Sequence, residues 1–412
     1  MQAKNLLFLS SLVLLLQAYS CDNGAVNQSA ENNSDSSKLP PVETKEPNSK
    51  YKPAFAGQTR IGAVKTTTAY NVAKIAQDIK SPFAVVPMPD GRLFVTSKSG
   101  YAEIHDTSGA LVKKITGFPE VVFAGQGGLL DVAFDPDYTN NKTIYWSFSE
   151  KYEPGNLMAV AKGQLNEAAG KVENPVVIFQ ATPALNSNNH FGSRLVFDKD
   201  GNLFASTGER SILEGRAQAQ KLESHLGKVF KITKDGKPAP GNPFINTAGA
   251  AQEVYSYGNR NVQGLDINPE TGELWEVEFG PRGGDEVNII RAGKNYGWPT
   301  ITYGIEYSGE KIGDAIQQKE GMEQPVYYWD PVVSPSGISF YKGNAIPEWK
   351  NNLFISCLSG QHIARLVIKD NKVVGEERLL EDQKERFRDV AYLNDELYAV
   401  TDDGDLYKIS KK

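Results

Sequence analysis

The sequence predicts an all-β fold, a six-bladed β-propeller built of four-stranded antiparallel blades. One observation is a recurring pattern in which an apolar strand leads to a turn containing Asp, Asn or Gly, and a second strand begins with a Leu-aromatic or Ile-aromatic pair. These turn residues, with the β-branched and aromatic content, are typical of β-hairpins. The other observation is that long amphipathic helical patterns are scarce, residues 216–226 being the best short candidate for a helix.

The hairpin pattern occurs six times along the chain. Its copies are residues 83–95, 128–146, 195–205, 264–275, 337–355 and 390–400. Intervals of roughly 45–80 residues between copies suit blades arranged around an axis, with loops of unequal length inserted between strands. A β-sandwich built from ordinary hairpins is the alternative that the pattern leaves open.

The N-terminus is expected to be an export signal rather than part of the fold. Lys4 precedes an apolar run, residues 6–16, that has the length of a signal peptide and is short for a membrane span. A small residue, Ser20, stands before Cys21, as at a bacterial lipoprotein processing site. We predict that residues 1–21 are a lipoprotein-type signal peptide and that Cys21 is lipidated, with plain cleavage of the leader as the alternative.

Composition predicts how the rest of the chain is organised and which partners it excludes. Residues 22–55 are rich in Ser, Asn, Glu, Lys and Pro, which predicts a disordered tether before a propeller domain at residues 56–412. Such a protein would be exported, periplasmic or on the outer surface, and would contact a membrane only through its anchor. A net charge of −6 and a pI near 5.5 argue against nucleic acid as a partner. We expect a monomer or a homodimer.

Hairpin geometry predicts where the unusual polar residues gather. Residues just before the first strand of a hairpin and just after the second lie at the same end. Such residues in the six copies should therefore converge at one mouth of the propeller axis, which is the default place for a ligand. They are Gln126, His190, Glu209, Arg260, Asn261, Gly280, Pro281, Ser334, Pro335, Ser336, Arg386 and Arg388.

Two pairs among these residues point to chemistry. His190 and Glu209 flank one hairpin turn almost symmetrically, so the carboxylate can fix the imidazole tautomer and leave the other ring nitrogen as a base. A structural histidine is the alternative. Arg386 and Arg388 alternate along a strand and should point the same way, as a multiply anionic ligand requires. Alternatively, they pair with Asp389 or Asp402 and cap the hairpin.

The segment 257–299 adds a candidate metal site. It combines the Gly280-Pro281 turn with Asp285, Glu286 and Tyr296 in a glycine-rich frame. Backbone carbonyls and carboxylates are the ligands that calcium prefers. A solvent-facing loop is the alternative interpretation for the acidic pair.

Taken together, these segments resemble the soluble quinoprotein sugar dehydrogenases, the six-bladed glucose and aldose dehydrogenases that use pyrroloquinoline quinone (PQQ) and calcium. The matching segments are GQGGLLDVAFDPDY, NNHFGSRLVFDKDGNLFASTGER, HLGKVFKI, YGNRNVQGLDINP, EFGPRGGDEVN, NYGWP and RFRDV. They span residues 81 to the C-terminus, almost the whole folded part. The shorter loops look closer to the aldose dehydrogenase branch than to the soluble glucose enzyme.

The resemblance implies a role for each candidate residue. His190 would be the base and Glu209 its orienting partner. The cofactor would be lined or bordered by Gln126, Arg260, Asn261, Tyr307, Ser334, Pro335, Ser336, Arg386 and Arg388. The carbonyls of Gly280 and Pro281 would help to hold a calcium ion beside the cofactor, and Glu286 and Tyr296 match a second, structural calcium position. The implied activity is oxidation of an aldose to its lactone, with electrons leaving to an acceptor that the sequence does not name.

Three positions depart from the family pattern. Ser359 stands where the family usually offers the cofactor a Lys, Asn189 stands where the glucose enzymes have Asp, and Glu209 replaces their Asp partner of the base. The missing Lys bears on cofactor affinity more than on the chemistry. Two other functions remain open: a non-catalytic propeller that binds a partner or glycan, and a calcium-dependent lactone hydrolase, which would need acidic and Asn metal ligands where this chain has Gln, His and Arg.

Overall fold

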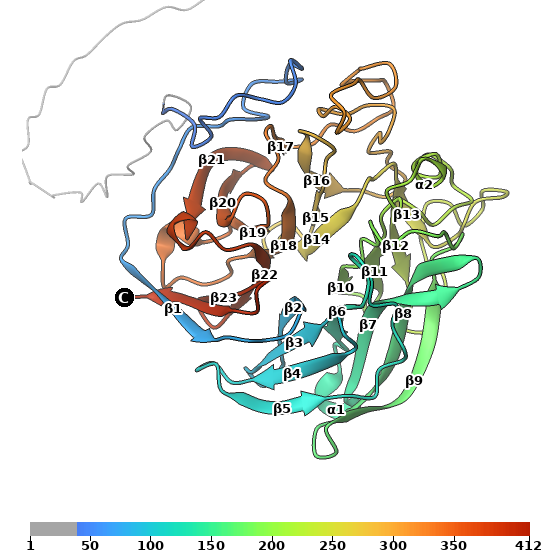
Figure 1. Cartoon of the computed structure of the whole chain (residues 1–412), viewed down its shortest axis with the longest axis vertical. Coiled ribbons are helices and arrows are strands. Elements are labelled where there is room, and N and C mark those ends of the chain that lie inside the picture. Colours follow the sequence, from blue (N-terminus) through green and yellow to red (C-terminus); the bar gives the residue numbers. More distant parts are fainter. Residues whose placement is uncertain (1–38) are drawn as a thin grey trace, which may run out of the picture. The chain divides into compact units, whose positions relative to one another are not determined.

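The computed structural model describes residues 39–412, and these residues form the predicted six-bladed propeller. Six four-stranded antiparallel sheets stand around a common centre, as Figure 1 shows. The first strand of each sheet lies next to the axis and packs against the first strands of both neighbouring blades. Each of the six sequence repeats supplies the two inner strands of one blade.

The blades follow one another along the chain. Blade 1 comprises β2 (Pro82–Pro87), β3 (Leu93–Ser97), β4 (Tyr101–His105) and β5 (Leu111–Ile115). Blade 2 comprises β6 (Leu129–Phe134), β7 (Thr143–Tyr152), β8 (Gly155–Asn166) and β9 (Lys171–Gln180). Blade 3 comprises β10 (Leu195–Phe197), β11 (Leu203–Ser206), β12 (Lys228–Ile232) and β13 (Val254–Tyr257). Blade 4 comprises β14 (Val262–Ile267), β15 (Leu274–Glu278), β16 (Asp285–Ile290) and β17 (Tyr327–Trp329).

Blade 5 comprises β18 (Pro335–Phe340), β19 (Leu353–Cys357), β20 (His362–Lys369) and β21 (Lys372–Leu379). Blade 6 joins the two ends of the propeller: β22 (Phe387–Leu393), β23 (Glu396–Thr401) and β24 (Leu406–Lys411) take β1 (Tyr70–Ala76) as their outer strand. The β1–β24 pairing is antiparallel and runs from Tyr70 opposite Lys411 to Ala76 opposite Leu406. This pairing closes the ring, because it joins the strand that precedes blade 1 to the blade formed by the C-terminal strands.

The core is divided among the blade interfaces. One apolar cluster fills each of the six contacts between neighbouring blades, from Phe94 and Trp146 between blades 1 and 2 to Val95 and Tyr398 between blades 6 and 1. Because both faces of every sheet are covered by neighbours, the inner strands read as nearly continuous apolar runs. All five residues of β3 and of β19 are buried.

Short polar side chains link the inner strands of successive blades. Thr96, Ser147 and Ser206 each accept a hydrogen bond from the first strand of their own blade and donate one to a carbonyl of the next blade. The carboxylate of Asp131 accepts an amide hydrogen bond from Leu195 in the next blade at 2.8 Å. These links fix the height of each blade relative to its neighbour, and therefore align the strand ends that carry the site.

Helices are short and few among the described residues: α1 (Tyr138–Asn141), α2 (Leu213–Arg216) and the 3₁₀ turns η2 (Pro347–Trp349) and η3 (Glu381–Gln383). The helix expected at 216–226 is not formed, since α2 ends at Arg216 and turns follow. The Lys228 ammonium explains why. It donates hydrogen bonds to the carbonyls of Gln218, Ala219 and Leu226 at 2.7–3.0 Å, so these carbonyls are satisfied without a helix.

The segment before blade 1 is ordered further toward the N-terminus than its composition predicted. Residues 39–55 were assigned to the disordered tether, whereas in the structure they pack on the propeller. Ser49 is buried and donates its hydroxyl to Asp330 at 2.9 Å, and Glu43 pairs with Arg378 at 2.9 Å. Long-range polar contacts of this kind hold a segment that has little apolar surface to bury. The predicted signal peptide, Cys21 and the first part of the predicted tether lie outside the described residues, within which no helix has the length and hydropathy of a membrane span.

Candidate active site

A cavity of about 300 Å³ opens at one mouth of the propeller axis, and every blade contributes to its wall. The contributions, taken from blade 1 to blade 6, are Lys98, Gln126, His190, Tyr307, Ser334 and the Arg386/Arg388 pair. Of the twelve residues expected to converge at this mouth, five line the cavity: Gln126, His190, Ser334, Arg386 and Arg388. His190 belongs to blade 3 and the arginines to blade 6, so the two groups face the cavity from opposite sides of the ring.

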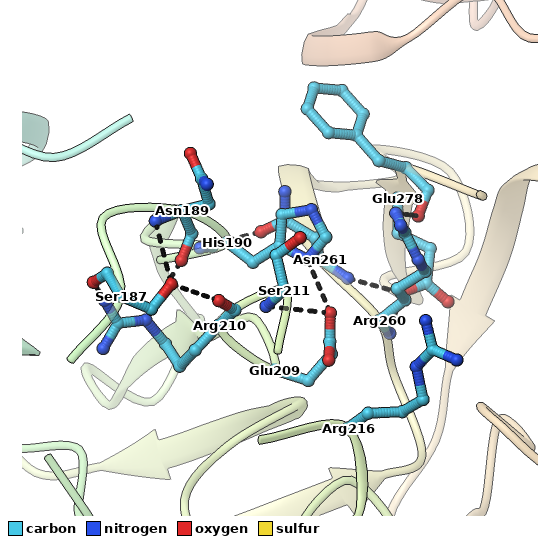
Figure 2. A network of polar contacts seen from close by, with 12 residues as sticks. Ser187, Asn189, His190, Glu209, Arg210, Ser211, Arg216, Arg260, Asn261 and Glu278 are labelled. Atoms are coloured by element: carbon cyan, nitrogen blue, oxygen red, sulfur yellow. Dashed lines mark hydrogen bonds and ion pairs between the residues drawn. The ribbon is translucent and has the colours of Figure 1, made fainter. Parts of the chain in front are cut away.

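His190 and Glu209 meet as the hairpin geometry predicted. The imidazole Nδ1 lies 2.6 Å from Glu209 Oε1, and both side chains are buried (Figure 2). Glu209 Oε1 also accepts a hydrogen bond from the Ser211 amide at 3.1 Å, and this bond helps to fix the orientation of the carboxylate. With Nδ1 occupied, Nε2 is the ring nitrogen that His190 can present to the cavity.

The main chain around this pair is tightly constrained. Gly208, just before Glu209, has no room for a Cβ, which would lie 2.4 Å from the carbonyl oxygen of His190. The His190 amide donates to Gln126 Oε1 at 2.7 Å, and His190 adopts a positive φ of 50°. Arg210 is buried and donates to the carbonyls of Asn156 at 2.9 Å and Asn189 at 3.1 Å. The loop that carries His190 is thus held from three sides.

Burial sets the protonation state of the imidazole. It lowers the pKa of His190 to about 4, with help from the positive charge of Arg260 and against the opposing effect of Glu209. The ring is therefore neutral at pH 7, which is the form a base requires. Glu209 stabilises the imidazolium that forms when the ring accepts a proton, because a carboxylate beside Nδ1 favours its charged form.

Arg386 and Arg388 are joined by one carboxylate. Arg386 Nε donates to one oxygen of Asp402 at 2.9 Å, and Arg388 Nε donates to the other at 2.8 Å. The pairing with Asp402 that the sequence left open is therefore present, while both guanidinium groups still line the cavity. Asp389 instead faces the axis and pairs with Arg194 at 3.2 Å. One carboxylate cannot neutralise two guanidinium groups, so this wall stays cationic.

Arg260 and Asn261 are held beneath the cavity by Glu278. Both backbone amides donate to Glu278 Oε2, at 2.5 and 3.2 Å. Arg260 Nη1 donates to the carbonyls of Phe279 and Gly280, at 2.9 and 2.8 Å. Asn261 is buried, and its Oδ1 accepts a hydrogen bond from the Gly192 amide. Asn261 therefore supports the cavity floor and does not line the cavity.

A second, narrower cavity holds the expected metal ligands Gly280, Pro281, Glu286 and Tyr296. Glu278 also lines this cavity and lies opposite Glu286 in the β15–β16 ladder, in which Glu276 lies opposite Asn288. Burial raises the pKa of Glu278 to about 7 and those of Glu276 and Glu286 well above their usual range, the last two also because of the charge on Glu278. Like charges opposed across a ladder are unfavourable unless a proton or a cation neutralises them.

The oxygen atoms around this cavity suit a hard cation only in part. Glu276 Oε2 and Asn288 Oδ1 are buried without a hydrogen-bond partner, as a cation-binding oxygen would be. The Tyr296 hydroxyl, however, donates to Ile289 and accepts from the Arg291 amide, which leaves only its carbonyl for a metal. Within residues 39–412, no group of three or more His, Cys, Asp or Glu side chains converges in metal-binding geometry. Main-chain carbonyls would have to complete any coordination shell.

Several predicted residues lie outside the main cavity. Pro335 and Ser336 are buried in β18, and Ser359 is exposed beside Ser334, with their hydroxyls 2.7 Å apart. Lys98 was not among the predicted residues, and it lines the cavity from the position just after β3. Lys98, like Glu209, follows the second strand of a hairpin, so the criterion that selected Glu209 applies to Lys98 as well. Phe83, Phe191, Gln263 and Phe279 also line the wall and were not predicted.

Comparison with known proteins places the chain in a family. The family described as Glucose / Sorbosone dehydrogenase matches residues 79–408, which is nearly the whole propeller. The chain belongs to the glucose/sorbosone dehydrogenase family. The aldose sugar dehydrogenase YliI of Escherichia coli is 39% identical over 348 residues, covering 83% of this chain and 93% of YliI. The quinoprotein glucose dehydrogenase B of Acinetobacter calcoaceticus is 26% identical over 369 residues, covering 71% of this chain and 76% of that protein.

Among solved structures, the PQQ-bound aldose sugar dehydrogenase of Streptomyces coelicolor superimposes on this family member with a TM-score of 0.69. The two are 29% identical, over 84% of this chain and 99% of that one. A solved glucose dehydrogenase structure is 40% identical to this chain, close to the 39% of YliI, so the identities support the family without choosing between its aldose and glucose branches.

Proposed function

We propose that this protein oxidises aldose sugars at the anomeric carbon to lactones, using PQQ and calcium. One observation carries the proposal: a buried His190–Glu209 pair faces, across a single cavity, the cationic wall formed by Arg386 and Arg388. A base and an anion clamp in the same cavity are what such a reaction needs. A propeller that only binds a partner needs no base, and the cavity wall lacks the acidic and Asn residues of a lactone hydrolase.

His190 is the proposed base. A neutral imidazole with Nδ1 held by Glu209 can remove the proton of the anomeric hydroxyl through Nε2. Glu209 is a positioning residue in this step, because it orients the ring and stabilises the resulting imidazolium without contacting the sugar. PQQ, when bound, supplies the two-electron acceptor that takes the hydride from the anomeric carbon.

The cationic wall is the proposed site for the PQQ carboxylates. Arg386 and Arg388 present guanidinium groups, which bind carboxylates with two parallel hydrogen bonds. Gln126 and Ser334 add neutral polar groups at the rim, and Tyr307, whose side chain is largely exposed, can cover a flat ring. Arg260 lies beneath the cavity, where its positive charge would stabilise negative charge on a bound quinone.

The proposed calcium ligand set combines the carbonyls of Gly280 and Pro281 with Glu286 and the carbonyl of Tyr296. A divalent cation there would neutralise the opposed carboxylates of β15 and β16 and withdraw charge from a bound quinone. Arg260 Nη1 donates a hydrogen bond to the Gly280 carbonyl at 2.8 Å. Calcium that bound this carbonyl would release a donor of Arg260 toward the cavity.

The test is reconstitution of the purified apo-protein with PQQ and calcium, followed by reduction of an artificial dye with several aldoses. The proposal requires that dye reduction depend on all three components. Loss of sugar-dependent reduction at every PQQ and calcium concentration would overturn it. We also propose export and lipid attachment at Cys21, which mass spectrometry of the N-terminal fragment from membranes can test.

A further inference from the structure

The cavity holds a third cation, Lys98, that forms no close ion pair among the described residues. Lys98 lines the wall next to Arg388, and the two arginines already share the single carboxylate of Asp402. Among the described residues, no carboxylate lies within ion-pair distance of the Lys98 ammonium. Three basic side chains therefore face one acidic partner. A cavity with this excess of positive charge is suited to a ligand that carries more than one negative charge.

The contacts of Lys98 differ from those of a structural lysine. Its Nζ donates one hydrogen bond, to the carbonyl of Gly125 at 3.3 Å, and lies 5.9 Å above the ring of Phe123. Lys228 shows the contrast, because all three of its donors are bonded to backbone carbonyls at 2.7–3.0 Å. An ammonium group has three donors, so Lys98 retains capacity for a ligand where Lys228 has none.

The backbone of Lys98 is fixed where blades 1 and 2 meet. Its amide donates to Ser81 at 2.9 Å, and its carbonyl accepts from Leu129 in the first strand of blade 2 at 3.0 Å. Burial, together with the charge of Arg388 and against the opposing charge of Asp402, lowers the pKa of Lys98. An anion bound beside Lys98 would offset this effect, because an opposite charge favours the protonated form.

The position of Lys98 complements that of Ser359. Blade 6, which carries the arginines, lies between blade 5 and blade 1. Ser359 belongs to blade 5, is exposed, and has its hydroxyl bonded to Ser334. It brings no charge to the arginine pair, whereas Lys98 approaches that pair from the other flank.

We propose that Lys98 is the third cationic contact for the carboxylates of PQQ and supplies from blade 1 the charge that Ser359 lacks in blade 5. This inference rests on the proposed function, since it assigns a ligand to the same cavity. Lys98 acts on cofactor affinity, and it takes no part in proton removal.

The experiment is calorimetric titration of the full-length apo-protein with PQQ in calcium-containing buffer, at low and at high salt. Lys98→Met keeps most of the side-chain volume and removes the charge, while Lys98→Arg keeps the charge. Loss of one hydrogen bond to a charged group should weaken PQQ binding by about 10- to 100-fold in Lys98→Met at low salt. The loss should shrink as salt rises, and Lys98→Arg should bind nearly as the wild type does.

The matched control is Lys199→Met, which removes a charge from an exposed turn at the far end of blade 3 and should leave PQQ affinity unchanged. Thermal unfolding of each apo-variant verifies that the fold is retained. If wild type and Lys98→Met bind PQQ equally at low salt, the inference is wrong while the proposed function stands. If the wild type binds no PQQ at any calcium concentration, both fail together.

Discussion

Nδ1 of His190 and Oε1 of Glu209 lie 2.6 Å apart, and the contact joins two loops that are 19 residues apart in the chain. The contact depends on the antiparallel pairing of β10 with β11. This pairing brings the start of β10 next to the end of β11, and the two loops continue from these strand ends. Because the carboxylate is buried and its other oxygen has no hydrogen-bond partner among the described residues, its negative charge acts mainly on the imidazole.

Replacing the base should separate chemistry from cofactor binding. We expect His190→Ala to cut turnover by about 10²–10⁴, the usual loss for a general base, while PQQ affinity stays nearly intact. Steady-state rates and PQQ titration measure the two quantities. Glu209→Gln serves as the companion variant, because it keeps the side-chain shape and should lower turnover less. Unchanged turnover in His190→Ala would remove the histidine from the mechanism.

The pH dependence follows from the lowered pKa of His190. With this pKa at about 4, kcat/KM should stay level from neutral pH down to roughly pH 5 and fall only below that, as the free enzyme loses its neutral base. The same shift makes stability depend on pH. In the unfolded chain the histidine has a pKa near about 6.5, so as pH falls the unfolded state binds this proton before the folded state does. The contribution of His190 to the free energy of unfolding therefore declines as pH falls from about 6.5 to 4. A kinetic limb near pH 6.5 that vanishes in His190→Ala would contradict the buried, neutral imidazole.

The two arginines should differ in their effect on the cofactor. Their side-chain exposures are 47% for Arg386 and 14% for Arg388, so an ionic hydrogen bond made by Arg388 is less screened by solvent. We expect Arg388→Ala to weaken PQQ binding by about 1.5–3 kcal/mol and Arg386→Ala by less. The sugar KM, measured at saturating PQQ, should change little in either variant. Normal calorimetric PQQ binding in both would rule out the clamp.

The axial ion cluster should govern stability. Arg194 is buried between Asp131 and Asp389, with Nη1 at 3.7 and 3.2 Å from their carboxylates, and burial raises the pKa of Asp131 to about 6. Arg194→Met would leave both carboxylates without a counterion, so we expect a loss of about 3–5 kcal/mol at pH 8. Because protonated carboxyl groups need no partner, the loss should be smaller at pH 5.

Urea unfolding at pH 8 and at pH 5 measures this loss. Arg92→Met is the control, since Arg92 forms partly exposed ion pairs with Asp90 and Glu167 and should cost less than about 1 kcal/mol. Equal losses of unfolding free energy in Arg194→Met and Arg92→Met would contradict the role of Arg194 as a buried counterion.

The sequence predicted the propeller because each blade repeats one local signal, a hairpin whose turn residues and strand composition agree. It also predicted that His190 and Glu209 meet, since two residues flanking one turn are brought together by a regular hairpin. Lys98 was missed although it stands just after β3, because a lysine near a turn is most often a surface residue. The order of residues 39–55 could not be predicted, since it rests on partners such as Asp330 that are far away in the chain.

The position of Ser359 leads to the last prediction. Its hydroxyl is exposed and 2.7 Å from that of Ser334, which lines the cavity, so a longer side chain at residue 359 could extend toward the cofactor. Ser359→Lys should therefore tighten PQQ binding, with a gain that shrinks as salt rises. If Lys98 already supplies a cation, the gain should be larger in the Lys98→Met background than in the wild type, and a double-mutant cycle of PQQ affinities measures the difference. An unchanged affinity in both backgrounds would mean that this loop does not reach the cofactor, whereas equal gains would mean that the two positions act independently.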